Sequence, residues 1–143
     1  MVDPQLHADP AISVSDLSLG YPPHGGAKAF NAIEGVGFEV RRGGVLAVLG
    51  ESGSGKTTLT RYLAGRGSEP SDKGARILPI GGDVTVLGTP LRRLSRRAMT
   101  RLRAHLGHLA QDAGATLPAD LTVGDILLQP VLEHLDGNQW HAN

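Results

Sequence analysis

The residues with the clearest capacity for chemistry are nine consecutive ones, 50–58, which read Gly-Glu-Ser-Gly-Ser-Gly-Lys-Thr-Thr. A triphosphate is a dense anion, so a small site for it needs many donors at short range, and backbone N–H groups supply them where the chain wraps closely. Gly50, Gly53 and Gly55 lack a Cβ and can take positive φ, which permits that wrapping. The spacing therefore predicts a phosphate-binding loop in which Lys56 reaches the β- and γ-phosphates.

The same loop contains the remaining groups that a nucleotide site needs. The Thr57 hydroxyl is the predicted protein ligand of Mg²⁺, and the first turn of the following helix adds the positive end of its dipole. The residues of the loop predicted to bind the cofactor are Gly50, Glu51, Ser52, Gly53, Ser54, Gly55, Lys56, Thr57 and Thr58.

A phosphate-binding loop has to be held between a strand and a helix. Residues 45–49 form an apolar run that predicts the strand, and residues 59–64 alternate apolar and polar types at helical spacing. Residues 12–19, 30–33 and 35–40 read as extended segments, and no helix intervenes between them. We therefore expect an antiparallel sheet beside the nucleotide core, and an α/β fold overall.

Downstream of the loop, residues 77–80 and 83–88 predict two short strands joined by a Gly-Gly connection. Residues 106–110 are a short apolar run, which predicts a further strand in the core. Residues 122–125 match a capping box that opens a helix.

Residues 91–102 predict an amphipathic helix with a basic outer side. Its apolar stripe has helical spacing and consists of Leu91, Leu94, Ala98 and Leu102. Its other sides carry Arg92, Arg93, Arg96, Arg97, Arg101 and Arg103. One interpretation is a solvated basic face, and the other is contact with an acidic partner surface or with nucleic acid. No aromatic side chains lie among the arginines to stack on bases, so we expect no nucleic acid.

Composition limits the remaining possibilities. The 143 residues suffice for one domain, and 14 basic residues balance 14 acidic ones, so net charge indicates no polyanionic partner. The absence of cysteine excludes disulfides and thiol chemistry. No apolar run is long enough to cross a bilayer, so we expect any membrane role to act through partners.

Tyr21, the loop and Gln111 together resemble the nucleotide-binding domain of ABC transporters, over about residues 12–135. The resemblance implies that Tyr21 stacks on adenine. It implies that Gln111 touches Mg²⁺ and the attacking water, and so shares the catalytic role with Lys56. The loop spelling is similar to that of importers of peptides and nickel. The implied cofactors are ATP and Mg²⁺.

The resemblance also implies a domain map. Residues 1–10 are a disordered lead-in, and residues 11–143 are a partial nucleotide-binding domain with its phosphate loop at 50–58. The Gln loop lies near residue 111, and the helical subdomain starts at about residue 120. The fold is then a P-loop NTPase core with an antiparallel β subdomain, truncated before the helical subdomain is complete.

Three motifs of that family do not occur in the sequence: the Asp-Glu pair after four apolar residues, the Leu-Ser-Gly-Gly-Gln signature and the switch histidine. We therefore expect this chain to bind ATP with Mg²⁺ and to hydrolyse it poorly on its own, although the family's enzymes are ATPases. Implied partners are transmembrane permease subunits and a second nucleotide-binding domain in a head-to-tail dimer. The implied location is cytoplasmic, at the inner face of the cell membrane.

Two other functions stay open at this stage. A non-catalytic nucleotide-binding or regulatory module would use its basic helix to hold a partner. A small-molecule P-loop kinase also places such a loop before a helix, but about forty residues of extended chain precede the loop here.

Overall fold

A computed structural model describes residues 9–23, 26, 28–67, 76–111, 114 and 117–128. The chain divides into two compact units, residues 1–108 and 109–143, and each is described by itself. Most of the predicted lead-in, residues 1–8, lies outside the described residues.

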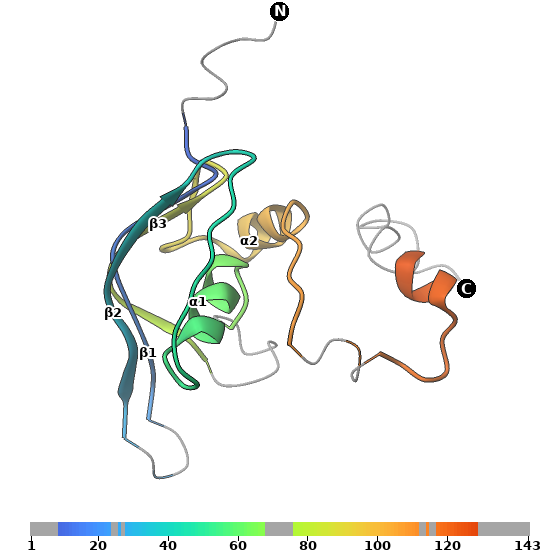
Figure 1. The fold of residues 1–143 in the computed structure, drawn as a ribbon, viewed down its shortest axis with the longest axis horizontal. Coiled ribbons are helices and arrows are strands. Elements are labelled where there is room, and N and C mark those ends of the chain that lie inside the picture. Colours follow the sequence, from blue (N-terminus) through green and yellow to red (C-terminus); the bar gives the residue numbers. More distant parts are fainter. Residues whose placement is uncertain are drawn as a thin grey trace, which may run out of the picture. The chain divides into compact units, whose positions relative to one another are not determined.

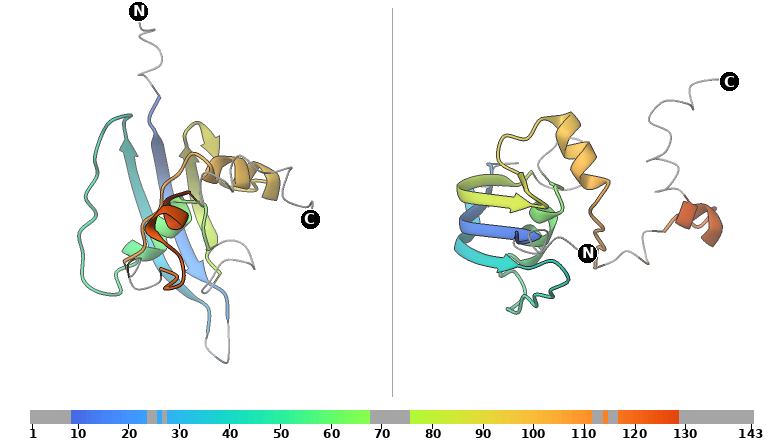
Figure 2. Two further views of the ribbon diagram at one scale, coloured as in Figure 1. Left: turned by 90° about the vertical axis from the view of Figure 1, so that its right-hand side faces the viewer. Right: turned by 90° about the horizontal axis from the view of Figure 1, so that it is seen from above.

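A four-stranded antiparallel sheet is the frame of the first unit. It contains β1 (Ile12–Tyr21), β2 (Phe30–Val40), β3 (Leu78–Val86) and β4 (Thr89–Pro90), in the spatial order β2-β1-β3-β4. Figure 2 shows the first three strands side by side. The antiparallel sheet expected from the sequence is therefore confirmed.

Two helices, α1 (Lys56–Leu63) and α2 (Arg96–Arg103), lie on the same side of this sheet (Figure 1). Between the sheet and the helices, apolar side chains from every long element are withdrawn from water, which is the main favourable term in folding. The buried apolar residues are Val14, Leu17, Leu19, Ile33, Leu59, Tyr62, Ile77, Val84, Val86, Leu91, Met99 and Leu102.

The three long strands bulge at one common level. Asp16 in β1, Gly35 in β2 and Gly82 in β3 have φ of 48°, 63° and 74°, and the pairing register shifts beside them. A Cβ on Gly82 would collide with the carbonyl oxygen of Asp16, so the strands touch at this level. Bulges increase bending and twist, and Figure 1 shows the strands bowed around the helices.

These bulges correct two predictions. Residues 30–33 and 35–40 form the single strand β2, and residues 78–86 form the single strand β3. Glycine in a strand pattern reads as a break, but here Gly35 and Gly82 hold bulges within continuous strands.

The strand predicted for residues 45–49 does not form. Val45 is 97% exposed and Leu49 is 91% exposed. A fully apolar strand is stable when neighbouring strands pair with it and its faces are covered. Among the described residues, no segment pairs with residues 45–49.

Two further predictions were wrong, one in the extent of a helix and the other in the existence of a strand. The helix predicted for residues 91–102 begins only after Ser95, whose hydroxyl accepts a hydrogen bond from Ala98 N at 3.3 Å. That N-cap ends the preceding turn, and the buried face of α2 consists of Met99 and Leu102. Residues 106–110 form no strand, and Leu109 is 86% exposed.

In the second unit, residues 123–128 are helical and start at the predicted capping box. Thr122 N donates to Asp125 Oδ2 at 3.0 Å, and Asp125 N donates to Thr122 Oγ1 at 3.2 Å. This reciprocal pair satisfies two amides that the helix start leaves without backbone partners. Within the described part of the chain, no helix has the length and apolarity to cross a membrane.

Candidate nucleotide-binding site

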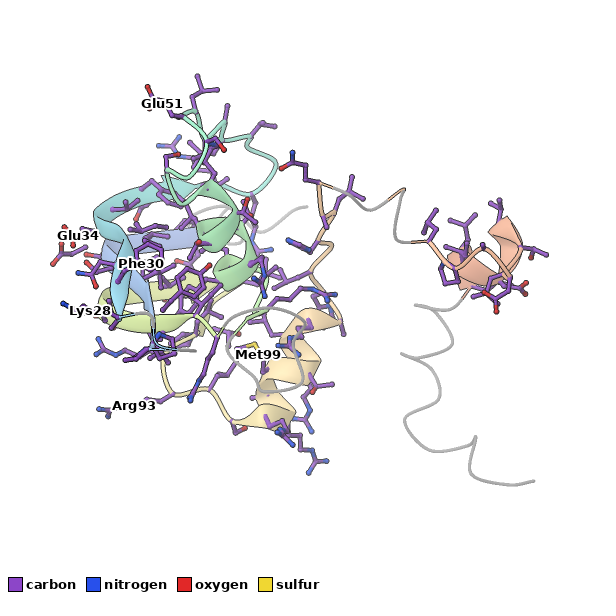
Figure 3. All side chains as sticks on the ribbon, turned by 90° about the horizontal axis from the view of Figure 1, so that it is seen from below. Lys28, Phe30, Glu34, Glu51, Arg93 and Met99 are labelled. Carbon is purple, nitrogen blue, oxygen red and sulfur yellow. The ribbon has the colours of Figure 1, made fainter. Side chains whose placement is uncertain are left out.

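The predicted phosphate loop connects β2 to α1 along the helix side of the sheet (Figure 1). Gly53 and Gly55 have φ of 83° and 88°, which residues with a Cβ rarely adopt. A Cβ on Gly50 would lie 2.6 Å from Ser54 Oγ, so the loop folds closely on itself at this position. Figure 3 shows the Glu51 side chain pointing outward from this loop.

Gly55 also anchors the loop to the sheet. A Cβ at this position would lie 2.5 Å from Ala32 O and 2.8 Å from a side-chain carbon of Ile33. The loop therefore meets β2 by direct backbone contact, which only glycine allows. This contact positions the first residue of α1 relative to the sheet.

Lys56 is held inside the loop by three hydrogen bonds. Its Nζ donates to Gly50 O at 2.8 Å, to Glu51 O at 2.6 Å and to Ser54 Oγ at 3.1 Å. An ammonium group has three donors, and each has an acceptor from the loop. The positive charge of Lys56 is thus held between the start of the loop, at Gly50 and Glu51, and Ser54.

The start of α1 is open to an anion. Its N-cap, Gly55, provides no side-chain hydrogen bond, and the first turn contains no acidic residue. The first amides of a helix have no backbone partner and carry the positive end of the dipole. Thr57 is exposed at this end, so its hydroxyl is accessible.

Tyr21, at the end of β1, is joined to the same helix. Its hydroxyl lies 2.9 Å from Oγ1 of Thr58, which is buried. Its ring stacks on Phe30, with centroids 5.4 Å apart and planes 19° from parallel. Phe30 is 57% exposed, and Figure 3 shows it at the start of β2. The predicted adenine platform and the loop helix are therefore in direct contact.

Gln111 is exposed and lies in the second unit, whereas the loop lies in the first. Its predicted contact with Mg²⁺ and water therefore stays a prediction. Asp125 is part of the capping box, and the Thr122 hydroxyl and amide lower the pKa of its carboxyl.

Two contacts beside Tyr21 and α1, made by Phe30 and Arg103, were not expected from the sequence. Phe30 faces Tyr21 because the two residues pair across β1 and β2, and a hairpin register would have indicated that contact. Arg103 donates from Nε to Gly65 O at 2.8 Å, just beyond the end of α1. A cation at this end of a helix is favourable, but helical periodicity alone places Arg103 with the solvated arginines.

Positive charge gathers beside this end of α1. The pKa of His108 lies below its ordinary value because of its burial and the nearby charges of Arg66 and Arg61. The lowered pKa favours the neutral form of the His108 imidazole near pH 7. The guanidinium groups, which do not titrate in this range, supply the charge here.

Comparisons with known proteins agree with this geometry. The sequence model of ABC transporters matches residues 33–141. The putative oligopeptide transport ATP-binding protein YkfD of Bacillus subtilis is 34% identical over 125 residues, which are 87% of this chain and 35% of that protein.

Two other relatives are named as import ATP-binding proteins. The glutathione import ATP-binding protein GsiA of Pectobacterium atrosepticum is 32% identical over 133 residues, which cover 90% of this chain and 20% of that protein. A putative peptide import ATP-binding protein of Brucella ovis is 32% identical over 120 residues, which cover 84% of this chain and 34% of that protein. This chain therefore spans about a third or less of the length of these relatives. Because the family match covers most of the sequence and includes the complete phosphate loop, the chain belongs to the ABC transporter family.

Proposed function

We propose that this chain is the ATP-binding part of an ABC transporter that imports peptides or a related small solute such as glutathione. The observation that carries the proposal is the closed phosphate loop, in which Lys56 Nζ is centred by three loop acceptors before the open start of α1. The cargo class comes from the names of the relatives.

Phosphate would bind by replacing acceptors that the loop now supplies. Lys56 Nζ, which now donates to Gly50 O and Glu51 O, would donate to phosphate oxygens instead. These oxygens would also accept hydrogen bonds from the first amides of α1. Charge-assisted bonds of this kind are about twice as strong as neutral ones. The loop needs little rearrangement, because its glycines already hold the wrapped backbone.

The remaining contacts extend from this centre. The exposed Thr57 hydroxyl would hold Mg²⁺, which is usually bound by one or two protein ligands together with phosphate oxygens. Adenine would stack on the face of Tyr21 that Phe30 does not cover. The buried Thr58 would act by fixing Tyr21 through its hydroxyl.

Hydrolysis and transport require groups beyond the loop. We assign to Gln111 the contact with Mg²⁺ and the attacking water, and to the segment after it the contact with a membrane permease. A second ATP-binding domain would face the loop in a head-to-tail dimer at the cytoplasmic side of the membrane. Turnover by these 143 residues alone should be very slow, because the sequence contains no Asp-Glu pair to position water.

The test is equilibrium binding of ATP to the purified chain, with and without Mg²⁺. We expect saturable binding that Lys56→Ala removes. Lys28→Ala is the matched control, since Lys28 is an exposed lysine that precedes β2 and is not part of the loop (Figure 3). Thr57→Ala should abolish the effect of Mg²⁺ while retaining metal-free binding.

Two outcomes would contradict the proposal. Equal loss of binding in both lysine variants would show that ATP binds by general charge. Lys56-dependent binding without any turnover, even after addition of a complete partner domain, would favour the regulatory module instead.

A further inference from the structure

A cavity of about 310 Å³ lies between β3, α2 and the turn that precedes α2. Its floor is apolar and is formed by Tyr62, Pro79, Leu91, Leu94 and Met99. Figure 3 shows Met99, a buried residue of α2. Pockets for small molecules begin at about this volume and are mostly apolar with a few polar groups. The cavity thus has the size and lining of a ligand site.

The cavity is separate from the phosphate loop. Tyr62 follows Lys56 by six residues, so the cavity adjoins the other end of α1, about 9 Å along the axis. A ligand here would not compete with phosphate for the same donors.

Three arginines, Arg92, Arg93 and Arg96, line the cavity, and none of its lining residues is acidic. Arg92 is held in place, because its Nη1 donates to Gly82 O at 3.1 Å. A guanidinium has five N–H donors in a planar fork, which matches a carboxylate. The bond to Gly82 O uses one of these five donors.

The field of Arg92 extends to the cavity floor. The pKa of Tyr62 is raised by burial, while the charge of Arg92 acts to lower it and that of Asp83 acts to raise it. Tyr62, which lines the cavity, therefore lies in the electrostatic field of Arg92. The carboxylate of Asp83, which does not line the cavity, opposes that field.

The turn that carries two of these arginines has a strained backbone. Arg93 has φ of 64°, a left-handed conformation that is rare in residues other than Gly, Asn and Asp. Leu94 N closes the turn on Leu91 O at 3.4 Å. Such conformations persist where the surrounding structure holds them, and they gather at ligand sites. Figure 3 shows Arg93 reaching outward from this turn.

We propose that this cavity binds a small organic anion, a carboxylate attached to an apolar body, with the body on the Leu91, Leu94 and Met99 floor and the carboxylate on the arginine rim. The site goes beyond nucleotide binding and is a candidate place for a small metabolite to act on the far end of α1. An apolar floor selects against a bare phosphate, and the arginine rim selects against a neutral hydrocarbon.

The probes are 4-phenylbutyrate, the neutral 4-phenyl-1-butanol and the cationic 4-phenylbutylamine, titrated into the full chain and followed by amide NMR shifts and calorimetry. We expect saturable binding of the carboxylate, about tenfold weaker binding of the alcohol and none of the amine. The shifted amides should be those of Leu78, of Ile80 and of residues 91–99, since Pro79 has no amide hydrogen.

Arg92→Gln should weaken 4-phenylbutyrate binding about tenfold. Arg97→Gln is the matched control, because Arg97 is an exposed arginine of α2 that does not line the cavity. Asp83→Asn should tighten binding, since it removes the opposing charge. Leu94→Trp, which fills the cavity without changing charge, should remove binding, and Lys56→Ala should leave it unchanged.

Equal binding of the carboxylate and the alcohol would overturn the proposal, as would equal weakening by Arg97→Gln and Arg92→Gln. Retained binding in a folded Leu94→Trp variant would also overturn it. Lys56→Ala distinguishes failure of this proposal from failure of the nucleotide proposal. The variant should lose ATP binding and retain 4-phenylbutyrate binding, so the two sites are tested independently in one protein.

Discussion

Strand β1 and residues 45–49 are both apolar-rich segments of the first unit, but they differ in pairing and in burial. β1 pairs on both sides, with β2 and β3, and buries Val14, Leu17 and Leu19. Residues 45–49 pair with no described segment, and Val45 and Leu49 are almost fully exposed. Apolar character therefore gives a strand only where pairing partners and a covering layer exist.

The sharpest test of this contrast compares the same substitution in both segments. Leu17→Ala should lower the free energy of unfolding by about 2–5 kcal/mol, because Leu17 is 1% exposed and leaves a cavity. Leu49→Ala should change it by less than about 0.5 kcal/mol. Urea titrations followed by circular dichroism measure both. A large loss in Leu49→Ala would mean that residues 45–49 are buried in solution.

The segment between β2 and α1 offers a second comparison, between a packed glycine and an open one. Gly55 and Gly43 both have positive φ, but only Gly55 would place a Cβ against the sheet. Gly55→Ala should therefore cost at least about 1 kcal/mol more than Gly43→Ala, and it should also remove ATP binding. Thermal melts with ATP titrations decide this. Equal costs would show that β2 yields to the added methyl group.

The packing of α1 against α2 depends on a polar contact. Arg103→Met keeps the aliphatic bulk but removes the bonds that Nε and Nη2 donate to Gly65 O, so we expect a loss of about 1–2 kcal/mol. Arg101→Met, at an exposed position of the same helix, should be near neutral. Urea unfolding of the two variants gives the difference. If the two losses are the same, the Gly65 contact contributes nothing.

The smallest effect is expected in the second unit, where hydrogen bonds define the helix start. The pKa of Asp125 is lowered by the Thr122 hydroxyl and amide from an ordinary value of 3.8. A depressed folded pKa means that this support is complete above the ordinary pKa and is lost as pH falls through the folded value. Carboxyl NMR titration should show that Thr122→Ala raises the pKa of Asp125. An unchanged pKa would exclude the capping box in solution.

Local patterns predicted several elements of the fold and the backbone of the loop at residues 50–58. The alternation over residues 12–19 predicts β1, and the residues of 122–125 predict the capping box. The glycines of the loop predict its backbone, since Gly53 and Gly55 take positive φ as expected. These features depend on neighbours in sequence, so sequence alone carries them.

Features that depend on distant partners were not predictable. The apolar run at residues 45–49 suggests that Leu49 is buried, but its burial would require other strands to pair with this run, and Leu49 is exposed. Gly82 reads as a break, but the opposite Asp16 makes it a bulge. Arg103 reads as solvated, but it contacts a carbonyl beyond another helix. The cavity has no sequence signal, because it lies between three separate elements.

The aligned bulges at Asp16, Gly35 and Gly82 restrict how this sheet can change in length. Side chains alternate between the faces of a strand, so deleting one residue on one side of a bulge would turn the rest of that strand inside out. The sheet would tolerate such a deletion only if a residue were also deleted at the same level of the other two long strands. The three positions are therefore coupled, and homologous sheets should gain or lose residues at this level together.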